Sequence, residues 1–169
     1  MGKILLICGK ICSGKSYYVR QLKQKVNAVV FSCDEILFDV SLESLADKHN
    51  EIVNKLKQYF YKKSEEIIMC GIDVILDFGF WSKEERNIVE LYFSEHNIPF
   101  EWHYVDVSDA DWKKNIEERN ALILKSKVNA FYVDEGLKMK LEKSFEKPLK
   151  HEIDVWITNK RSVMSVSTE

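Results

Sequence analysis

The sequence contains little of what marks a linker-rich or metal-stapled chain. It has two prolines and six glycines in 169 residues, and we find no internal repeat and no low-complexity linker in it. Its four cysteines, Cys8, Cys12, Cys33 and Cys70, form no CxxC pair, and no histidine stands beside them at metal-ligand spacing. A zinc site is therefore not expected, and we predict reduced thiols, most of them in the core, as in a cytoplasmic protein.

Long hydrophobic runs and an excess of charge of one sign are also missing. No apolar segment approaches the length of a membrane span, and the first apolar run is too short for a signal peptide. Leu6 stands where N-myristoylation needs Ser or Thr. The formal net charge of -2 argues against nonspecific coating of nucleic acid, although it still allows a local basic patch. We expect a cytoplasmic protein with no membrane partner.

What the sequence does contain is a regular alternation of strand and helix patterns. With 46% hydrophobic residues the chain can bury a full core, and its length fits one domain over 1–158, followed by a polar tail at 159–169. The predicted strands are 4–8, 27–32, 73–79, 100–107 and 153–158, and the predicted helices are 15–26, 50–70, 83–95, 109–124 and 134–146. This order predicts an α/β fold whose parallel sheet is covered on both faces and whose ligands bind at the carboxyl ends of the strands.

The segment GKICSGKS at 9–16 lies between the first predicted strand and the first predicted helix. It matches G-x-x-x-x-G-K-[ST], in which small glycines let the backbone N–H groups surround phosphate oxygens. The following helix adds the positive end of its dipole, Lys15 reaches the β- and γ-phosphates, and the Ser16 hydroxyl binds Mg²⁺. The predicted nucleotide-contacting residues are Gly9, Cys12, Ser13, Gly14, Lys15, Ser16 and Tyr17.

Two carboxylates follow strands at the same predicted edge of the sheet. Asp77 lies near the end of the third strand and is the candidate for Mg²⁺, while Asp34 follows the second strand and is the candidate base for an acceptor hydroxyl. The structural alternatives are a helix N-cap for 35–38 at Asp34 and a turn residue at Asp77. Asp106 also ends a strand, and we favour a structural role for it.

Aromatic residues and an arginine complete the list of candidates. Phe78 is expected to close the core, whereas Trp81 is left open as a stacking surface for an acceptor. Arg119 lies near the end of a predicted helix, and the stretch 119–133 is the natural lid. An arginine carried by a mobile segment offsets the charge of phosphoryl transfer, and the alternative is a solvated helix face. Lys125 and Lys127 lie in the same stretch.

These stretches together resemble a known group of proteins. The chain is similar to small P-loop kinases of the zeta-toxin, chloramphenicol-phosphotransferase and polynucleotide-kinase type, and most closely to a bacterial ATP-binding subgroup among them. The stretches that carry the resemblance run from residue 4 to 148 and are GKICSGKS, FSCDE, VILDFGFWSKEER, HYVDV, EERNA and FYVDEGL…FEKP. The resemblance implies a P-loop NTPase fold of three α/β/α layers, with five parallel strands, a helical lid, and the loop strand between those that end at Asp77 and Asp106.

The resemblance also implies roles for single residues. Lys15 would act on the phosphates, Ser16 and Asp77 at Mg²⁺, Asp34 as the acceptor-side base, and Arg119 at the lid. It leaves Arg86 either in contact with phosphate or substrate or in a helix-surface salt bridge. Polynucleotide kinases of this type carry an arginine three residues after the base, and Leu37 occupies that position here, so a nucleic-acid acceptor is not favoured.

The function expected from these residues is an ATP-dependent kinase that moves the γ-phosphoryl of Mg-ATP to a hydroxyl of a small molecule or a nucleic-acid end. ATP in place of GTP rests on the resemblance. The alternative is a nucleotide-binding regulatory switch that hydrolyses ATP slowly. An oligomeric mechanical ATPase is disfavoured, because no helical small domain follows the core. The sequence identifies neither the acceptor nor the oligomeric state.

Overall fold

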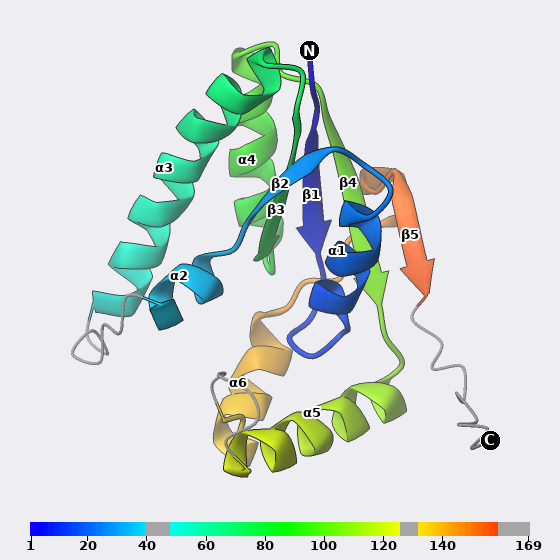
Figure 1. Cartoon of the computed structure of the whole chain (residues 1–169). Helices are drawn as coiled ribbons and strands as arrows, with labels where there is room; N and C mark the ends of the chain where they lie inside the picture. Colours follow the sequence, from blue (N-terminus) through cyan, green and yellow to red (C-terminus); the bar gives the residue numbers. More distant parts are fainter. Residues whose placement is uncertain (40–47, 126–131, 159–169) are drawn as a thin grey trace, which may run out of the picture.

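Five short segments pair in parallel to form the sheet at the centre of the molecule (Figure 1). The structure is a computed structural model that describes residues 1–39, 48–125 and 132–158. The strands are β1 (Ile4–Cys8), β2 (Ala28–Phe31), β3 (Asp73–Gly79), β4 (Phe100–Asp106) and β5 (Val155–Thr158), in the order β2-β3-β1-β4-β5. The loop strand β1 therefore lies between β3 and β4, and the expected α/β fold is confirmed.

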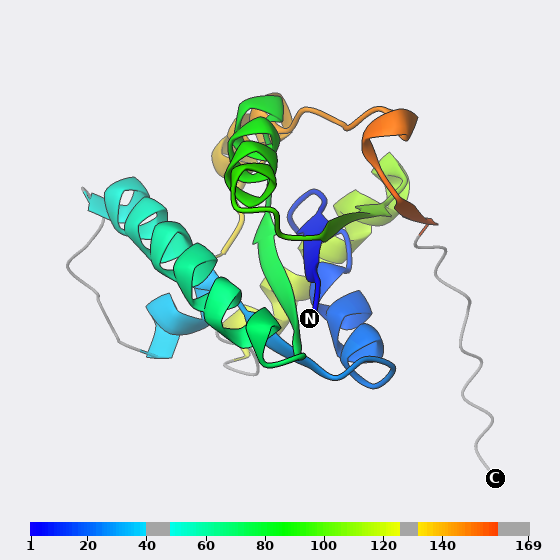
Figure 2. The ribbon, with the colours of Figure 1, turned by 90° about the horizontal axis from the view of Figure 1, so that it is seen from above.

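Helices cover both faces of this sheet (Figure 2). Residues of α3 and α4 pack with one face of β1, β3 and β4, and residues of α1 pack with the other face. The helices are α1 (Lys15–Lys23), α2 (Cys33–Asp39), α3 (His49–Met69), α4 (Lys83–Glu95), α5 (Asp109–Leu124) and α6 (Glu135–Ser144), with a 3₁₀ turn η2 (Lys150–Glu152) before β5. Helices α5 and α6 lie beyond the edge at which β1 and β4 end (Figure 1).

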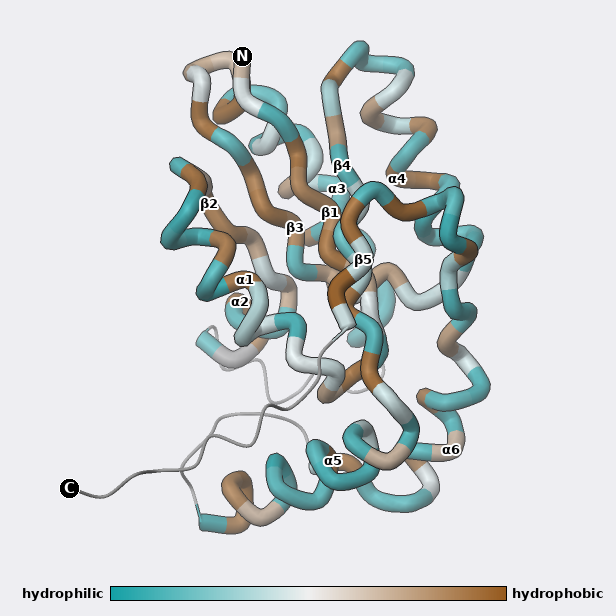
Figure 3. Tube along the Cα trace, turned by 90° about the vertical axis from the view of Figure 1, so that its right-hand side faces the viewer, coloured by the Kyte–Doolittle hydropathy of each residue, from teal (hydrophilic) through white to brown (hydrophobic). Residues whose placement is uncertain are grey.

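The central strand β1 is buried along its whole length. Ile4, Leu6 and Cys8 belong to the core under α3 and α4, whereas Leu5 and Ile7 belong to the core under α1. A strand buried on both faces shows no alternation of polar and apolar residues, which is why ILLIC reads as an unbroken apolar run. Figure 3 shows the hydrophobic residues concentrated in β1 and β3, while α5 is mainly hydrophilic.

Local signals in the sequence set the boundaries of β3 and α4. Both run over the predicted residues, and Ser82 and Glu85 form the expected capping box at the start of α4. Ser108 caps α5, and its side chain accepts from the Asp111 N–H. One helix, α2, was not predicted as an element of its own.

Several expectations concern residues outside the described part of the chain. The polar tail 159–169, Lys127 and most of the lid segment beyond Lys125 lie outside it. Within the described ranges, none of the helices combines the length and the apolar character needed to cross a bilayer. All four cysteines are free; Cys8 and Cys33 are buried, as expected for core thiols, whereas Cys70 is exposed.

The packing of α4 on the sheet gives a test of the core. Phe93 is fully buried and lies 5.5 Å from the Tyr61 ring and 5.3 Å from the Tyr92 ring. We expect Phe93→Ala to lower the free energy of unfolding by about 3–5 kcal/mol, because it leaves a cavity in this core. Leu91, which is 59% exposed on the same helix, supplies the control: Leu91→Ala should change stability by less than about 0.5 kcal/mol. Urea denaturation of both variants measures the difference, and equal effects would contradict the assigned packing.

Candidate functional site

The loop between β1 and α1 is anchored to the neighbouring strand at its first residue. The Gly9 N–H donates to the Gly79 carbonyl at 3.1 Å, which ties the start of the loop to the end of β3. A Cβ at Gly9 would lie 2.9 Å from both the Ser13 Oγ and the Val105 carbonyl oxygen. Gly14, with φ 96°, begins α1 in the left-handed region that favours glycine. Both glycines of the motif are therefore required by the shape of the loop.

The Lys15 side chain donates hydrogen bonds to the backbone of the loop. Its Nζ donates to the carbonyls of Gly9 at 3.1 Å and Lys10 at 2.8 Å, so the ammonium lies against the loop backbone at the N-terminus of α1. A partly buried cation beside the first N–H groups of a helix forms a site for anions. The loop thus has the charge and the geometry to bind phosphate.

Asp77 and Asp34 lie at the same edge of the sheet as Lys15. Asp77 is two residues from the end of β3, and Asp34 is in the first turn of α2. Burial raises the pKa of the Asp77 carboxyl, Lys15 opposes this shift, and Asp34 adds to it. The three charges are therefore close enough to act on one another. Asp34 is exposed and is not a helix cap: the Ser32 hydroxyl lies 3.4 Å from the Glu35 N–H at the start of α2.

Ser16 and Asp77 fit the requirements of Mg²⁺. The ion binds hard oxygen ligands and usually keeps waters and substrate phosphates in its shell, so that it needs only one or two protein ligands. A partly buried carboxylate whose pKa is raised by burial gains from a nearby cation. Among the described residues no group of three or more His, Cys, Asp or Glu side chains is arranged to hold a metal ion.

Helix α5 contacts the outer side of the phosphate loop through one of its faces. The Trp112 Nε1 donates to the Ile11 carbonyl at 2.8 Å, and the Asn115 Nδ2 donates to the Cys12 carbonyl at 2.9 Å. Arg119 follows one turn later, and its Nη1 lies 3.3 Å from the Cys12 Sγ. Positions i, i+3 and i+7 share a helix face, so this spacing in the sequence was the signal for Trp112 and Asn115, which were missed.

The end of α5 is joined to the start of α6. The Asn120 side chain donates to the Val133 carbonyl at 2.7 Å and accepts from the Val133 N–H at 2.9 Å. Val133 is buried in a small core with Trp112 and Ile116. Arg119, between Trp112 and this junction, thus lies beside Cys12 of the phosphate loop, while Lys125 is exposed; the role of Arg119 at a lid stays a prediction.

Other predicted residues lie apart from the centre of the site. The Tyr17 side chain is 55% exposed on α1, and its hydroxyl accepts from the Gln21 amide. Arg86 is 4% exposed and donates to the carbonyls of Phe80 at 3.3 Å and Glu146 at 3.0 Å. It also forms an ion pair with Glu152 at 3.9 Å, but the guanidinium is buried, so it joins the β3–α4 turn to the segment after α6.

The aromatic residues and Asp106 have mainly structural surroundings. Phe78 packs beside Phe60 and Tyr61 at the edge of the core, as expected. Trp81 folds back over Gly79, where its Nε1 would lie 2.6 Å from an added Cβ. Asp106 accepts from the Tyr104 hydroxyl and from the Lys147 Nζ at 3.0 Å, which matches the structural role favoured for it.

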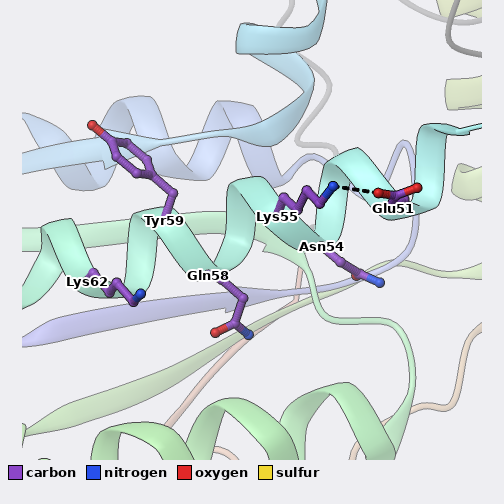
Figure 4. Close-up of a pocket in the computed structure, with 6 residues that line it drawn as sticks. All are labelled: Glu51, Asn54, Lys55, Gln58, Tyr59 and Lys62. Atoms are coloured by element: carbon purple, nitrogen blue, oxygen red, sulfur yellow. Dashed lines mark hydrogen bonds and ion pairs between the residues drawn. The ribbon is translucent and has the colours of Figure 1, made fainter.

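A shallow depression on the solvent side of α3 is a separate feature. Its lining comes from this one helix, and the side chains of Lys55 and Glu51 form an ion pair there at 2.5 Å (Figure 4). The lining residues are Glu51, Asn54, Lys55, Gln58, Tyr59 and Lys62. No residue of the phosphate loop contributes to it, so the depression is not part of the candidate site.

Comparison with known proteins agrees with the fold. The family model described as AAA domain matches residues 4–148, and no curated protein matches the chain. The fold is similar to APS kinase CysC of Mycobacterium tuberculosis in complex with AMPPNP and APS, at 18% identity and TM-score 0.63 over 95% of this chain and 90% of that one. It is also similar to a sugar kinase from Janibacter sp. (11%, TM-score 0.59, 94% and 86%) and to Kti12 of Chaetomium thermophilum in complex with ADP-AlF3 (15%, TM-score 0.62, 92% and 87%).

The close approach at Gly9 predicts a loss of nucleotide binding on substitution. In Gly9→Ala the added methyl group would meet the Ser13 hydroxyl and the Val105 carbonyl, so the loop must move from its anchor on β3. We expect ATP affinity to fall at least about 10-fold, since the backbone donors lose their alignment. Calorimetric titration with Mg-ATP measures it. Gly71→Ala, at a glycine with open space around its Cβ position, is the comparison; equal affinities in the two variants would show that the Gly9 contacts are irrelevant.

The raised pKa of Asp77 predicts that replacing this carboxyl by a neutral amide stabilises the ligand-free protein. Its carboxyl pKa is raised in the folded state, so the folded protein binds a proton more tightly than the unfolded chain does, and stability decreases as the pH rises through the folded-state pKa. Asp77→Asn should therefore raise the free energy of unfolding of the ligand-free protein at neutral pH. The gain should shrink as the pH falls and vanish below the pKa of an unfolded aspartate. Denaturation curves at several pH values decide it; a gain that grows toward acid pH would mean the sign is wrong.

Proposed function

The chain belongs to the AAA domain family, and from this premise we propose that it is an ATP-dependent phosphotransferase. It would move the γ-phosphoryl of Mg-ATP to a hydroxyl of a small molecule or of a nucleic-acid end. The observation that carries the proposal is the convergence of Lys15, Asp77 and Asp34 at one edge of the sheet. A phosphate-binding lysine, a magnesium carboxylate and an accessible base are the parts that phosphoryl transfer to an alcohol requires.

The loop residues would bind the phosphates of ATP. The backbone N–H groups between Gly9 and Ser16 surround the phosphates, and Lys15 exchanges its bonds to the loop carbonyls for bonds to phosphate oxygens. Ser16 and Asp77 would hold Mg²⁺, which neutralises phosphate charge when bound. Arg119 lies beside Cys12 on the outer side of the loop, from where its guanidinium offsets the negative charge of the transferred group.

Asp34 would act on the acceptor. Its exposed carboxylate accepts the proton of the acceptor hydroxyl while the hydroxyl oxygen forms a bond to the γ-phosphorus. The bond from that phosphorus to the bridging oxygen breaks, ADP leaves, and the proton stays on Asp34 until solvent removes it. Atoms and charge balance without any further reactant.

The solved relatives support a kinase more than a GTPase or a mechanical ATPase. Two of them are kinases by name. The APS kinase complex contains AMPPNP, and the Kti12 complex contains ADP-AlF3. ATP and Mg²⁺ are accordingly the proposed cofactors, and a small molecule is the favoured acceptor.

A regulatory switch that hydrolyses ATP slowly is the second candidate. One observation is consistent with it: the depressions on the outer face of α3 and between α5 and α6, built from described residues, do not include Asp34. A kinase and a switch share the phosphate loop, but only a kinase needs the base on the acceptor side.

The test is an acceptor screen. We would incubate the protein with Mg-ATP and either a cell extract or a panel of nucleosides, antibiotics, sugars and 5′-hydroxyl oligonucleotides. Mass spectrometry then detects species that gain one phosphoryl group, with Lys15→Ala as the blank. A product that depends on Lys15 supports the kinase and identifies its acceptor. ATP binding without any product from any pool would favour the switch.

Once a product is found, Asp34 is tested directly. Asp34→Asn should lower kcat by about 10²–10⁴-fold, the usual contribution of a general base. The affinity for Mg-ATP should stay within about threefold, because Asp34 belongs to α2 and not to the loop. Initial rates and a nucleotide titration measure the two quantities. An unchanged kcat would remove Asp34 from the proposed mechanism.

A further inference from the structure

Lys57 is a lysine on the inner side of an amphipathic helix. The buried residues of α3 are Phe60, Tyr61, Ser64 and Ile68, and Lys57 precedes Phe60 by one turn on the same side. The Lys57 side chain is 13% exposed, whereas that of Lys55, two residues earlier, is 74% exposed. Burying an ammonium costs hydration free energy unless a partner replaces the water, so this position calls for an explanation.

The turn of α3 that carries Lys57 is fixed beside the two carboxylates of the site. The Phe60 ring stacks on Phe31 at 4.5 Å and lies 5.8 Å from Phe78. Phe31 is the last residue of β2, shortly before Asp34, and Phe78 directly follows Asp77. Helix α3 begins near the edge where the strands end and runs away from it (Figure 1), and Lys57 precedes Phe60 in this helix.

The charge of Lys57 acts on a residue at the acceptor side of this edge, the thiol of Cys33. Cys33, next to Asp34, has a thiol pKa raised to about 12 by burial; Lys57 acts to lower it, whereas Asp34 and Asp77 act to raise it. One thiol is thus within reach of all three charges. Helix α2, which carries Cys33 and Asp34, packs against α3, which carries Lys57.

Glu85 forms an ion pair with the Lys57 ammonium, and backbone N–H groups fix the Glu85 carboxylate in turn. Its Oε1 accepts from the Lys57 Nζ at 2.7 Å, and its Oε2 accepts from the N–H groups of Trp81 at 2.8 Å and Ser82. Burial acts to raise the pKa of the Glu85 carboxyl, but the bonds from Lys57, Ser82 and Trp81 hold it below the usual value. The carboxylate is therefore a rigid, ionised anchor at the start of α4.

Lys57 keeps donors for a ligand. An ammonium has three N–H donors, and among the residues that the structure describes Lys57 donates to Glu85 alone. An oriented ammonium with spare donors beside a base suits an acceptor that carries an oxyanion, because it supplies charge-assisted hydrogen bonds and offsets repulsion from Asp34.

We propose that Lys57 binds an anionic group of the acceptor, a phosphate or a carboxylate, and thereby restricts the reaction to anionic alcohols. The inference rests on the proposed function and deepens it. Lys57 is a specificity residue, and Glu85 positions it. The competing explanation is an ion pair that only joins α3 to α4.

The experiment uses matched sets of alcohols with the full chain and saturating Mg-ATP. The sets are glycerol, glycerol 3-phosphate and glycerate, and ribose, ribose 5-phosphate and ribonate. The readout is kcat/KM for phosphoryl transfer, with the product identified by mass. The phosphate and carboxylate members separate the two sources of the oxyanion.

We expect the wild-type protein to prefer an anionic member to its neutral counterpart by at least about 10-fold. Lys57→Met should reduce that preference by about 10- to 100-fold, which corresponds to the loss of a charge-assisted hydrogen bond, and mainly through KM. Lys57→Arg should retain part of the preference. Lys55→Met, which removes a lysine from the exposed side of the same helix, should leave it unchanged.

A second variant separates binding from packing. Lys57→Met/Glu85→Gln replaces the ion pair by a neutral pair, so it should recover stability that Lys57→Met loses, without recovering the preference. If the double variant recovers both, or if Lys57→Met lowers anionic and neutral members equally, Lys57 is only structural. A wild-type preference for the neutral members would also overturn the proposal.

Failure of the kinase function is distinguishable from failure of this inference. If the wild-type protein transfers phosphate to no member, the ADP-saturated protein is titrated calorimetrically with glycerol 3-phosphate and ribose 5-phosphate and with their neutral and carboxylate counterparts. Anion binding that is lost in Lys57→Met supports the oxyanion site even though the kinase function has failed. Absence of binding by every anionic member overturns the inference.

Discussion

The parallel pairing of β1 with β3 on one side and β4 on the other is the constraint on which the site depends. Ile4 pairs with both Val74 and Phe100, so the three strands start level and end at one edge. Helices bury both faces of β1 and hold it in the core. Its register with β3 shifts once, between Leu6 and Cys8, so that Cys8 lies opposite Gly79. The hydrogen bond from Gly9 to Gly79 continues the pairing past the end of β1, so that the phosphate loop and the Asp77 strand share one frame.

The charges of the site are concentrated where this apolar frame ends. Lys15 donates to loop carbonyls, and Lys57 is paired with Glu85. Asp77, by contrast, has its pKa raised by burial and only partly restored by Lys15. Ionised Asp77 would therefore gain from a nearby cation. In the ligand-free protein its ionisation lowers stability.

Elements that are defined by local sequence patterns could be predicted from the sequence. Contacts between residues far apart in the chain could not. The run DVILDFG and the Ser82–Glu85 spacing set β3 and α4, because each carries its own start and stop signals. Helix α2 has seven residues, too few to show a period. The inner position of Lys57 follows from the period of α3, but its partner Glu85 lies 28 residues away in the sequence. Likewise, nothing near Arg86 indicates that its guanidinium binds carbonyls before and after it in the chain.

The contacts of α5 with the phosphate loop limit how loop segments can be exchanged between related proteins. Carbonyls of the loop accept hydrogen bonds from the side chains of Trp112 and Asn115, which lie about a hundred positions later in the chain. The loop motif and this helix face are therefore one structural unit, although they lie far apart in the sequence. A chimera that received only a foreign loop would keep a helix fitted to the old backbone path, and recombination should succeed best where both segments cross over together.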